Sequence, residues 1–157
     1  MKIRNRHTLL IIVLIVIIGF VLMKTVYNNY VNNGKQQVSD IDLKNFNLKN
    51  QWAYYTWNSF DDSDSPKLSK KFKGFTGTQI LDSVNLKNGN SINLNFESDV
   101  KKGKFNIVVI DDKYNILKVI KANSNGKEKI NATQDGKYKV EMLGKNAGGK
   151  AFAYWSK

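Results

Sequence analysis

Hydrophobic residues follow two different patterns along this chain. Thr8–Met23 is an unbroken, uncharged and almost entirely aliphatic run, whereas from Trp52 onward short apolar runs alternate with polar residues, as in strands with one buried face. The stretch between them is dominated by Asn, Gln, Lys and Asp and has no clear period. This division predicts a basic tip and membrane anchor over residues 1–24, a polar spacer over 25–50 and a folded domain over 51–157.

The aliphatic run is long enough to cross a membrane. A spanning helix needs about 20 residues, and Thr8–Tyr27 has that length if the Lys24 ammonium extends to the headgroups. A cleaved signal peptide is the alternative, but no Ala precedes Ala53 to form a cleavage site. We therefore predict an uncleaved signal-anchor. By the positive-inside rule, basic residues before the run keep the N-terminus cytoplasmic and the domain extracytoplasmic; these are Lys2, Arg4 and Arg6.

Within the spacer, single apolar residues are scattered among polar ones. We expect Val38–Leu48 to dock on the domain, and the remainder to act as a flexible tether. A coil of the spacer's length has an end-to-end distance of about 25–30 Å, which would hold the domain clear of the headgroups.

The domain's pattern predicts short strands separated by turn residues. Asn88-Gly89 lies between two alternating runs and is a strong hairpin signal. Seven to nine strands about ten residues apart predict an all-β fold, an antiparallel β-sandwich or jelly roll. The expected strands are Gln79–Lys87, Asn90–Glu97, Gly103–Ile110, Tyr114–Lys121, Lys127–Ala132, Lys137–Leu143 and Lys150–Ser156, with turns at Asp111-Asp112-Lys113, Asn125-Gly126, Asp135-Gly136 and Gly148-Gly149.

Alternation within these runs predicts which side chains face the core. Val108 and Ile110 fill the opposite face of their own strand as well, so that strand should be central. The expected inward sets are Phe105, Ile107 and Val109, then Tyr138, Val140 and Met142, and finally Phe152 and Tyr154.

The chain carries a formal net charge of +12, almost all of it from Lys. Every Arg lies within the first six residues, and Arg is the better reader of phosphate and base edges. Sequence-specific nucleic-acid binding is therefore not expected. A diffuse Lys excess suits loose attraction to anionic polymers, although a genome rich in A and T would produce the same excess. Without Cys, neither disulfides nor a lipidated Cys can form.

Catalytic groups are scarce. The single His is His7, beside the anchor, so no Ser-His or Cys-His pair is available to the domain. Carboxylate pairs such as Glu97 with Asp99, or Asp111 with Asp112, lie where turns are expected, and Asp is favoured in turns for its bonds to the backbone. We predict that the protein is not an enzyme and needs no cofactor.

Asp61, Asp62 and Asp64 form the one acidic cluster. Alternating Asp oxygens on a loop can bind Ca²⁺. However, the glycine turn and distal Glu of an EF-hand are missing, so a solvated loop before Pro66 is the preferred interpretation.

An aromatic cluster opens the domain. In a regular strand, Trp52 and Tyr54 would share one face and Tyr55 and Trp57 the other, with Phe60 nearby. Exposed aromatics on a sheet face stack sugar rings in many carbohydrate-binding modules. The alternative is that they cap the edge of the core. The candidate ligand-binding residues are Trp52, Tyr54, Tyr55, Trp57 and Trp155, the last lying on the face opposite Tyr154.

Two stretches resemble small extracytoplasmic β-sandwich proteins of Gram-positive bacteria. The first is Gly103–Asp111 followed by Tyr114–Leu117, and the second is Asp135–Val140 running through Gly144–Gly149 to a final aromatic strand. The resemblance spans Phe72 to Trp155. It implies a jelly-roll-like fold and a cell-surface location but no activity, and many of the proteins it resembles are lipoproteins, whereas this chain has no lipidation Cys.

We therefore expect a non-enzymatic, membrane-anchored protein of the cell envelope whose domain binds or senses a wall glycan or an anionic wall polymer. An accessory subunit of a membrane protein complex is the alternative, and a surface hydrolase is a third option.

Overall fold

The computed structural model describes residues 15–26, 38–49, 52–61 and 69–157. The chain divides into two compact units, residues 1–36 and 37–157. In the first unit, residues 15–26 form a helix, and residues 8–14 of the predicted anchor lie outside the described part. Within the described residues, no helix has both the length and the apolar content that crossing a membrane requires.

The second unit is all-β, as predicted, and its described residues form seven strands in one antiparallel sheet. β4 pairs with β7, β5 and β6, so the strand with apolar residues on both faces is central, which confirms that prediction. A short 3₁₀ helix, Leu43–Asn45, precedes the sheet. The strands are β1 (Ala53–Tyr54), β2 (Trp57–Asp61), β3 (Ser69–Leu86), β4 (Ser91–Ile110), β5 (Ile116–Lys121), β6 (Asn125–Asn131) and β7 (Gly136–Ser156).

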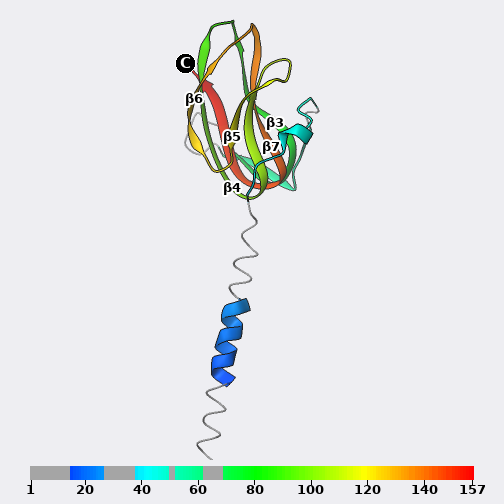
Figure 1. Ribbon diagram of the computed structural model, residues 1–157, viewed down its shortest axis with the longest axis vertical. Helices are drawn as coiled ribbons and strands as arrows, with labels where there is room; N and C mark the ends of the chain where they lie inside the picture. Colours follow the sequence, from blue (N-terminus) through cyan, green and yellow to red (C-terminus); the bar gives the residue numbers. More distant parts are fainter. Residues whose placement is uncertain (1–14, 27–37, 50–51, 62–68) are drawn as a thin grey trace, which may run out of the picture. The chain divides into compact units, whose positions relative to one another are not determined.

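Three long strands run through two parts of this sheet. The pairing of β3 shifts register between Phe72 and Gly77, and that of β4 between Val100 and Lys104. Figure 1 shows these long strands curving at the bottom of the domain. We call the two parts the open half and the covered half. The open half contains residues 69–77 of β3, 91–100 of β4 and 147–156 of β7, together with β1, β2 and β6. The covered half contains residues 78–86 of β3, 104–110 of β4 and 136–144 of β7, together with β5.

Both halves contribute side chains to one hydrophobic core. Phe72 of the open half stacks on Phe105 of the covered half with ring centroids 5.4 Å apart, and Phe75 meets the Phe72 ring edge-on. The predicted inward sets Phe105, Ile107, Val109 and Tyr138, Val140, Met142 are all fully buried. Alternation therefore identified the core face of both central strands.

The Asn88-Gly89 turn forms but does not make a hairpin. Asn90 N–H donates to the Lys87 carbonyl at 3.0 Å, yet β7 lies between β3 and β4 in the sheet. Only Gly89 has a positive φ (+81°), as in a type II turn, whereas the expected hairpin turn requires positive φ at both central residues. The turn thus connects the covered half to the open half, and the pairing prediction was wrong.

Glycines expected in a turn or at the start of a strand instead lie within long strands. Gly103 and Gly148-Gly149 are inside β4 and β7, so each pair of predicted strands is one strand that bends. A Cβ on Gly149 would lie 2.3 Å from the Asp99 carbonyl oxygen, and one on Gly103 would lie 2.3 Å from the Asn146 carbonyl oxygen. These glycines let neighbouring backbones approach at the bend. The predicted turn at Asn125-Gly126 is likewise wrong, because β6 already begins at Asn125.

The predicted inward pair on the last strand was also wrong. Ala151 and Ala153 belong to the core, and Trp155 packs against it. Phe152 and Tyr154 therefore project from the other face, with ring centroids 6.2 Å apart. Alternation gives two possible faces, and hydrophobicity alone selected the wrong one, because the inward positions carry the small residues Ala151 and Ala153 while the larger Phe152 and Tyr154 lie opposite.

Residues 38–49, which we call the strap, dock on the covered half. Ser39 N–H donates to the Gly103 carbonyl at 3.2 Å, and Phe105 N–H donates to the Ser39 carbonyl at 3.1 Å. Ile41 and Leu48 pack on the outward side chains Val108, Ile110 and Leu143. The docking predicted for Val38–Leu48 is thus present.

Candidate functional site

The aromatic segment lies along one edge of the open half. Trp52, Tyr54 and Trp57 are 53%, 59% and 53% exposed, whereas Tyr55 turns inward and stacks on Phe75 with ring centroids 5.0 Å apart. The expected alternation fails because β1 and β2 are separate strands. Between them Thr56 bonds to the Lys73 carbonyl through its N–H at 3.0 Å and its hydroxyl at 2.7 Å.

Tyr55 takes part in a polar cluster at the edge of the core. Its hydroxyl and the Lys70 ammonium both donate to Gln79 Oε1, and Lys70 Nζ lies 4.7 Å from the centre of the Tyr55 ring. Burial raises the pKa of the Tyr55 hydroxyl and lowers that of Lys70. These contacts give Tyr55 a structural position inside the fold, away from the exposed aromatics.

Trp155 is also separated from the exposed aromatics. Its ring packs against the core, and its backbone N–H donates to Asp82 Oδ2 at 2.9 Å. The indole Nε1 is buried and finds no hydrogen-bond acceptor among the described residues. Of the five aromatic candidates, the structure therefore leaves Trp52, Tyr54 and Trp57 on the surface.

The acidic cluster falls largely outside the described residues. Asp61 ends β2, and Asp62 and Asp64 belong to the segment 62–68, which is not described. No group of three or more His, Asp or Glu residues within the described part could hold a metal ion.

The carboxylate pairs considered for catalysis occupy different settings. Glu97 and Asp99 lie within β4 rather than in a turn, and they face Lys150 at 3.8 Å and Lys101 at 2.6 Å. Asp111 does occupy the predicted turn, where Asn115 N–H and Lys113 N–H donate to its Oδ1 at 2.8 and 2.9 Å. Burial would raise the pKa of Asp111, but hydrogen bonds from Asn115 and Lys113 outweigh burial and lower it.

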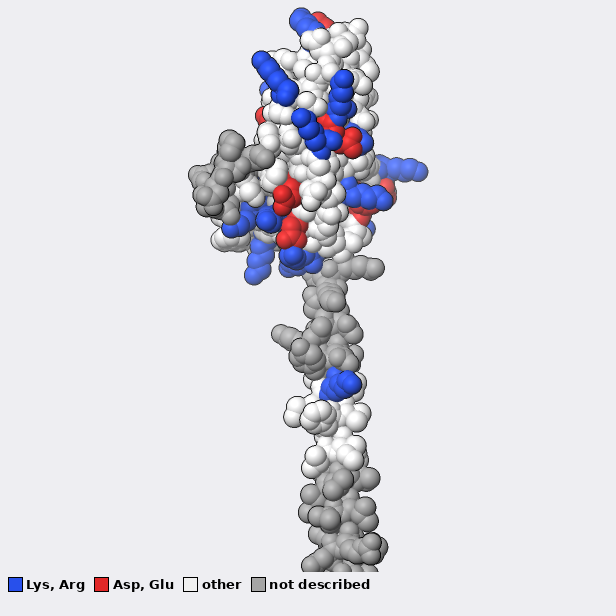
Figure 2. All heavy atoms as spheres, turned by 90° about the vertical axis from the view of Figure 1, so that its left-hand side faces the viewer, with Lys and Arg blue, Asp and Glu red and all other residues white. Residues whose placement is uncertain are grey.

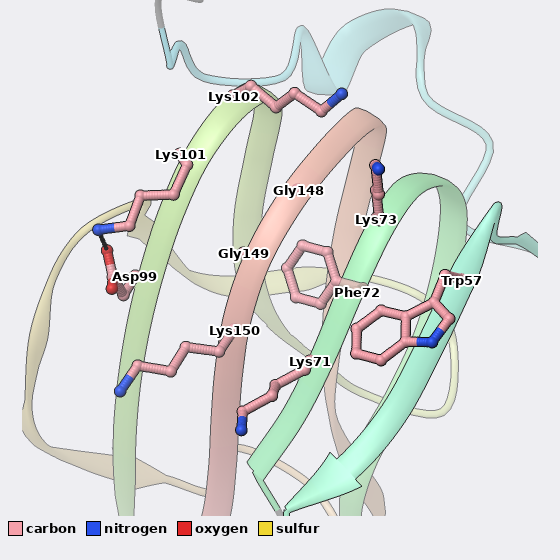
Figure 3. A pocket seen from close by; sticks show the side chains of 10 residues that line it. All are labelled: Trp57, Lys71, Phe72, Lys73, Asp99, Lys101, Lys102, Gly148, Gly149 and Lys150. Atoms are coloured by element: carbon pink, nitrogen blue, oxygen red, sulfur yellow. Dashed lines mark ion pairs between the residues drawn. The ribbon is translucent and has the colours of Figure 1, made fainter. Parts of the chain in front are cut away.

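A groove of about 450 Å³ lies on the outer face of the open half. Figure 3 shows Gly148 and Gly149 of β7 along its middle, between the lysines of β3 and those of β4, with the Trp57 indole at the β2 side. Phe72, which is only 3% exposed, lies beneath the groove. The residues that line the groove are Trp57, Lys71, Phe72, Lys73, Asp99, Lys101, Lys102, Gly148, Gly149 and Lys150.

The charge around this groove is one-sided. Five lysines and a single acid line it, and Lys101 and Asp99 form an ion pair at 2.6 Å. Neither Lys73 nor Lys102 forms a salt bridge with another described residue. Lys150 lies 3.8 Å from Glu97, and Figure 2 shows Lys and Arg side chains interspersed with Asp and Glu on one face of the molecule. With five lysines against one lining acid, the groove carries a net positive charge that attracts anions.

Lysine side chains also give the groove apolar surface. A Cβ on Gly148 would lie 3.1 Å from Lys102 Cε and 3.2 Å from its Cγ, so the hydrocarbon stem of Lys102 lies across Gly148. Lys stems can cover apolar surface while the ammonium stays in water. The groove thus combines an apolar floor and an aromatic side with a cationic rim.

Trp57 was a candidate from the sequence, whereas the lysines and glycines of the groove were not. Lys71 and Lys73 alternate with the inward Phe72, a pattern visible in the sequence. What the pattern does not show is that β7 separates β3 from β4, which brings Gly148 and Gly149 between two sets of lysines. Comparisons add nothing to this picture, since no protein-family model and no curated protein matches the chain.

Proposed function

We propose that this is a non-enzymatic, membrane-anchored protein of the cell envelope whose domain binds an anionic wall polymer in the lysine groove. The observation that carries the proposal is the groove itself, where five lysines and Trp57 surround a glycine floor with one acid among them. Positive charge at that density attracts polyanions in a salt-dependent way.

The proposed architecture is a β-sandwich of the jelly-roll type. Its support is that the two halves of the bent sheet share one core, and that three chain connections cross between the halves: β3 to β4, β5 to β6 and β6 to β7. The strap covers one outer face, which leaves the outer face with the groove as the binding surface.

The proposed anchor rests on the aliphatic run and on the surface of helix 15–26. Ile15, Phe20 and Met23 are 63%, 76% and 75% exposed, and the large apolar residues on every side of the helix are exposed in the same way. A helix that is apolar all round needs lipid or protein around it. The basic residues before the run orient the domain outward.

Binding to wall material tests the proposal. Full-length protein in neutral detergent should sediment with purified cell wall at low salt and be released as salt is raised. Replacing Lys73 and Lys102 together with Gln should reduce the bound fraction several-fold. The matched control replaces Lys121 and Lys137, two exposed lysines outside the groove, and removes the same charge. Equal loss in both variants would show non-specific attraction and contradict the groove as the site.

An accessory subunit of a membrane protein complex is the second candidate, and one observation favours it. β5 pairs only with β4 among the described strands, and its Ile116, Leu117 and Val119 are 38%, 36% and 40% exposed. An edge strand with apolar side chains can pair with another protein. A stable membrane partner that copurifies with the wild type but not with Val119→Lys, together with no wall binding, would favour this function.

A further inference from the structure

We propose that the ligand of the groove is an acidic glycan, a chain in which sugar rings alternate with phosphate or carboxylate groups. This inference rests on the proposed function and deepens it. The alternatives are a small free anion and a polyanion without rings, and the titration described below distinguishes the acidic glycan from both.

The spread of the lysines favours a ligand with several charges. Neighbouring strands lie about 4.8 Å apart, so lysines on β3 and β4, with β7 between them, have backbones roughly 10 Å apart. Lys71 and Lys73 are two residues apart on one strand, which is about 7 Å, and Lys150 lies on the strand between. One phosphate or carboxylate can contact only some of these ammonium groups, whereas a ligand with repeated charges can contact lysines of all three strands at once.

The floor of the groove requires more than charge. Gly148 adds no side chain, and the Lys102 stem lies across it. A polyanion made only of hydrated charged groups gains nothing from this apolar surface. Sugar rings present apolar C–H faces as well as polar edges, so a glycan can occupy the floor while its charged groups reach the ammonium groups at the rim.

Trp57 supplies the surface on which a ring can stack. It is 53% exposed, its backbone pairs with Lys73, and Figure 3 shows its indole beside the β3 lysines. Stacking on an aromatic face adds to the energy of area burial. The pairing of Trp57 with Lys73 places a ring contact and a charge contact side by side, which matches a ligand in which rings and anions alternate.

Four probes separate the ligand classes when titrated against the full-length protein in neutral detergent. Octagalacturonate has rings and charges, long-chain polyphosphate has charges only, chitohexaose has rings only, and pyrophosphate is a small anion. We expect octagalacturonate to bind at least tenfold more tightly than pyrophosphate or chitohexaose. We expect Trp57→Ala to weaken octagalacturonate binding about tenfold and to leave polyphosphate binding within twofold.

Two further variants complete the test. Trp52→Ala is the matched control, since Trp52 is equally exposed but does not line the groove, and it should bind octagalacturonate as the wild type does. Lys73→Gln with Lys102→Gln should weaken both polyanions. If both polyanions bind and Trp57→Ala affects them equally, the glycan inference is wrong while the proposed function stands. If neither binds, or only pyrophosphate does, the proposed function fails as well.

Discussion

The two outer faces of the bent sheet are made by the same three long strands, yet they differ in composition and in burial. On the covered half, Val108, Ile110 and Leu143 point outward and are fully buried, because the strap lies over them. On the open half, the outward positions that line the groove carry lysines, Asp99, Trp57 or glycine, and Phe152 and Tyr154 lie farther along the same face of β7. Apolar outward side chains require a cover, whereas charged ones do not. The composition of each face thus decides whether it is closed by the chain itself or stays accessible to a ligand.

The largest expected effect comes from uncovering the covered half. Replacing Ile41 and Leu48 together with Ala should lower the free energy of unfolding by about 4–10 kcal/mol, because each large-to-small change at a buried site costs about 2–5 kcal/mol. Denaturant titration followed by tryptophan fluorescence measures it. The control, Lys44→Ala with Lys49→Ala, changes exposed positions of the strap and should leave the midpoint almost unchanged. An equal midpoint for both double variants would show that the strap is not part of the folded core.

Two neighbouring glycines sharpen the comparison at the bend. Gly149→Ala places a Cβ 2.3 Å from the Asp99 carbonyl oxygen and 2.7 Å from Val100 Cα, so backbone must move, at a cost of about 3 kcal/mol or more. Gly148→Ala meets only the flexible Lys102 side chain and should cost less than about 1 kcal/mol. Thermal melting of both variants decides this. A reversal of the order would mean that the strands approach differently at the bend.

A buried amide joins the strap to the sheet. Asn106, 1% exposed, accepts from Ile41 N–H at 2.7 Å and donates to Asp40 Oδ1 at 3.0 Å. Asn106→Ala leaves the Ile41 N–H without this acceptor and should cost about 1–3 kcal/mol. Hydrogen exchange should show faster exchange at Ile41 in particular. Uniform acceleration across the domain, with nothing extra at Ile41, would contradict a local role.

The buried carboxyl of Glu141, in the covered half, should make the free energy of unfolding depend on pH. Burial raises the pKa of Glu141, and Lys139 opposes this by lowering it. Because the folded pKa lies above the ordinary value of 4.5, the folded state holds the proton longer. The free energy of unfolding should therefore fall as pH rises from 4.5 through the folded pKa. In Glu141→Gln this fall should disappear, which unfolding titrations from pH 4 to 8 can measure. Parallel curves for wild type and variant would contradict the assignment.

The smallest expected effect concerns the stability of the open half. Lys73→Gln with Lys102→Gln should change the free energy of unfolding by less than about 0.5 kcal/mol, because neither side chain has a salt bridge to lose among the described residues. The same variant should bind the anionic polymer several-fold less. A large loss of stability would instead make these lysines structural.

Several features of the fold were predictable because they depend on local sequence. Alternation found the core face of the central strands, from Phe105 to Val109 and from Tyr138 to Met142, and the Asn88-Gly89 turn forms where expected. The Asp111 turn joins β4 to β5 as a hairpin, since an Asp that accepts bonds from the following backbone favours a turn. Each of these depends on residues within a few positions of one another.

Other predictions failed where distant segments meet. Gly148-Gly149 has the composition of a turn, but the approach of β4 made it a bend within a strand. Tyr55 and Trp57 were assigned to one face, but the break at Thr56 separated them. Within the candidate site, Trp57 was predictable as a member of the aromatic cluster that opens the domain. The lysines around it were not, because they converge only once β7 lies between β3 and β4.

The sequence alone determined an all-β domain, the positions of several turns and the inward faces of its central strands, because period-two patterns and turn residues act over short distances. Only the tertiary structure decided which strands are neighbours, which face of the last strand is inside, and which outer face is covered. Those choices depend on the volume that facing strands leave for each side chain and on the strap, which covers the apolar outward face. The groove exists because no such cover is needed over lysine.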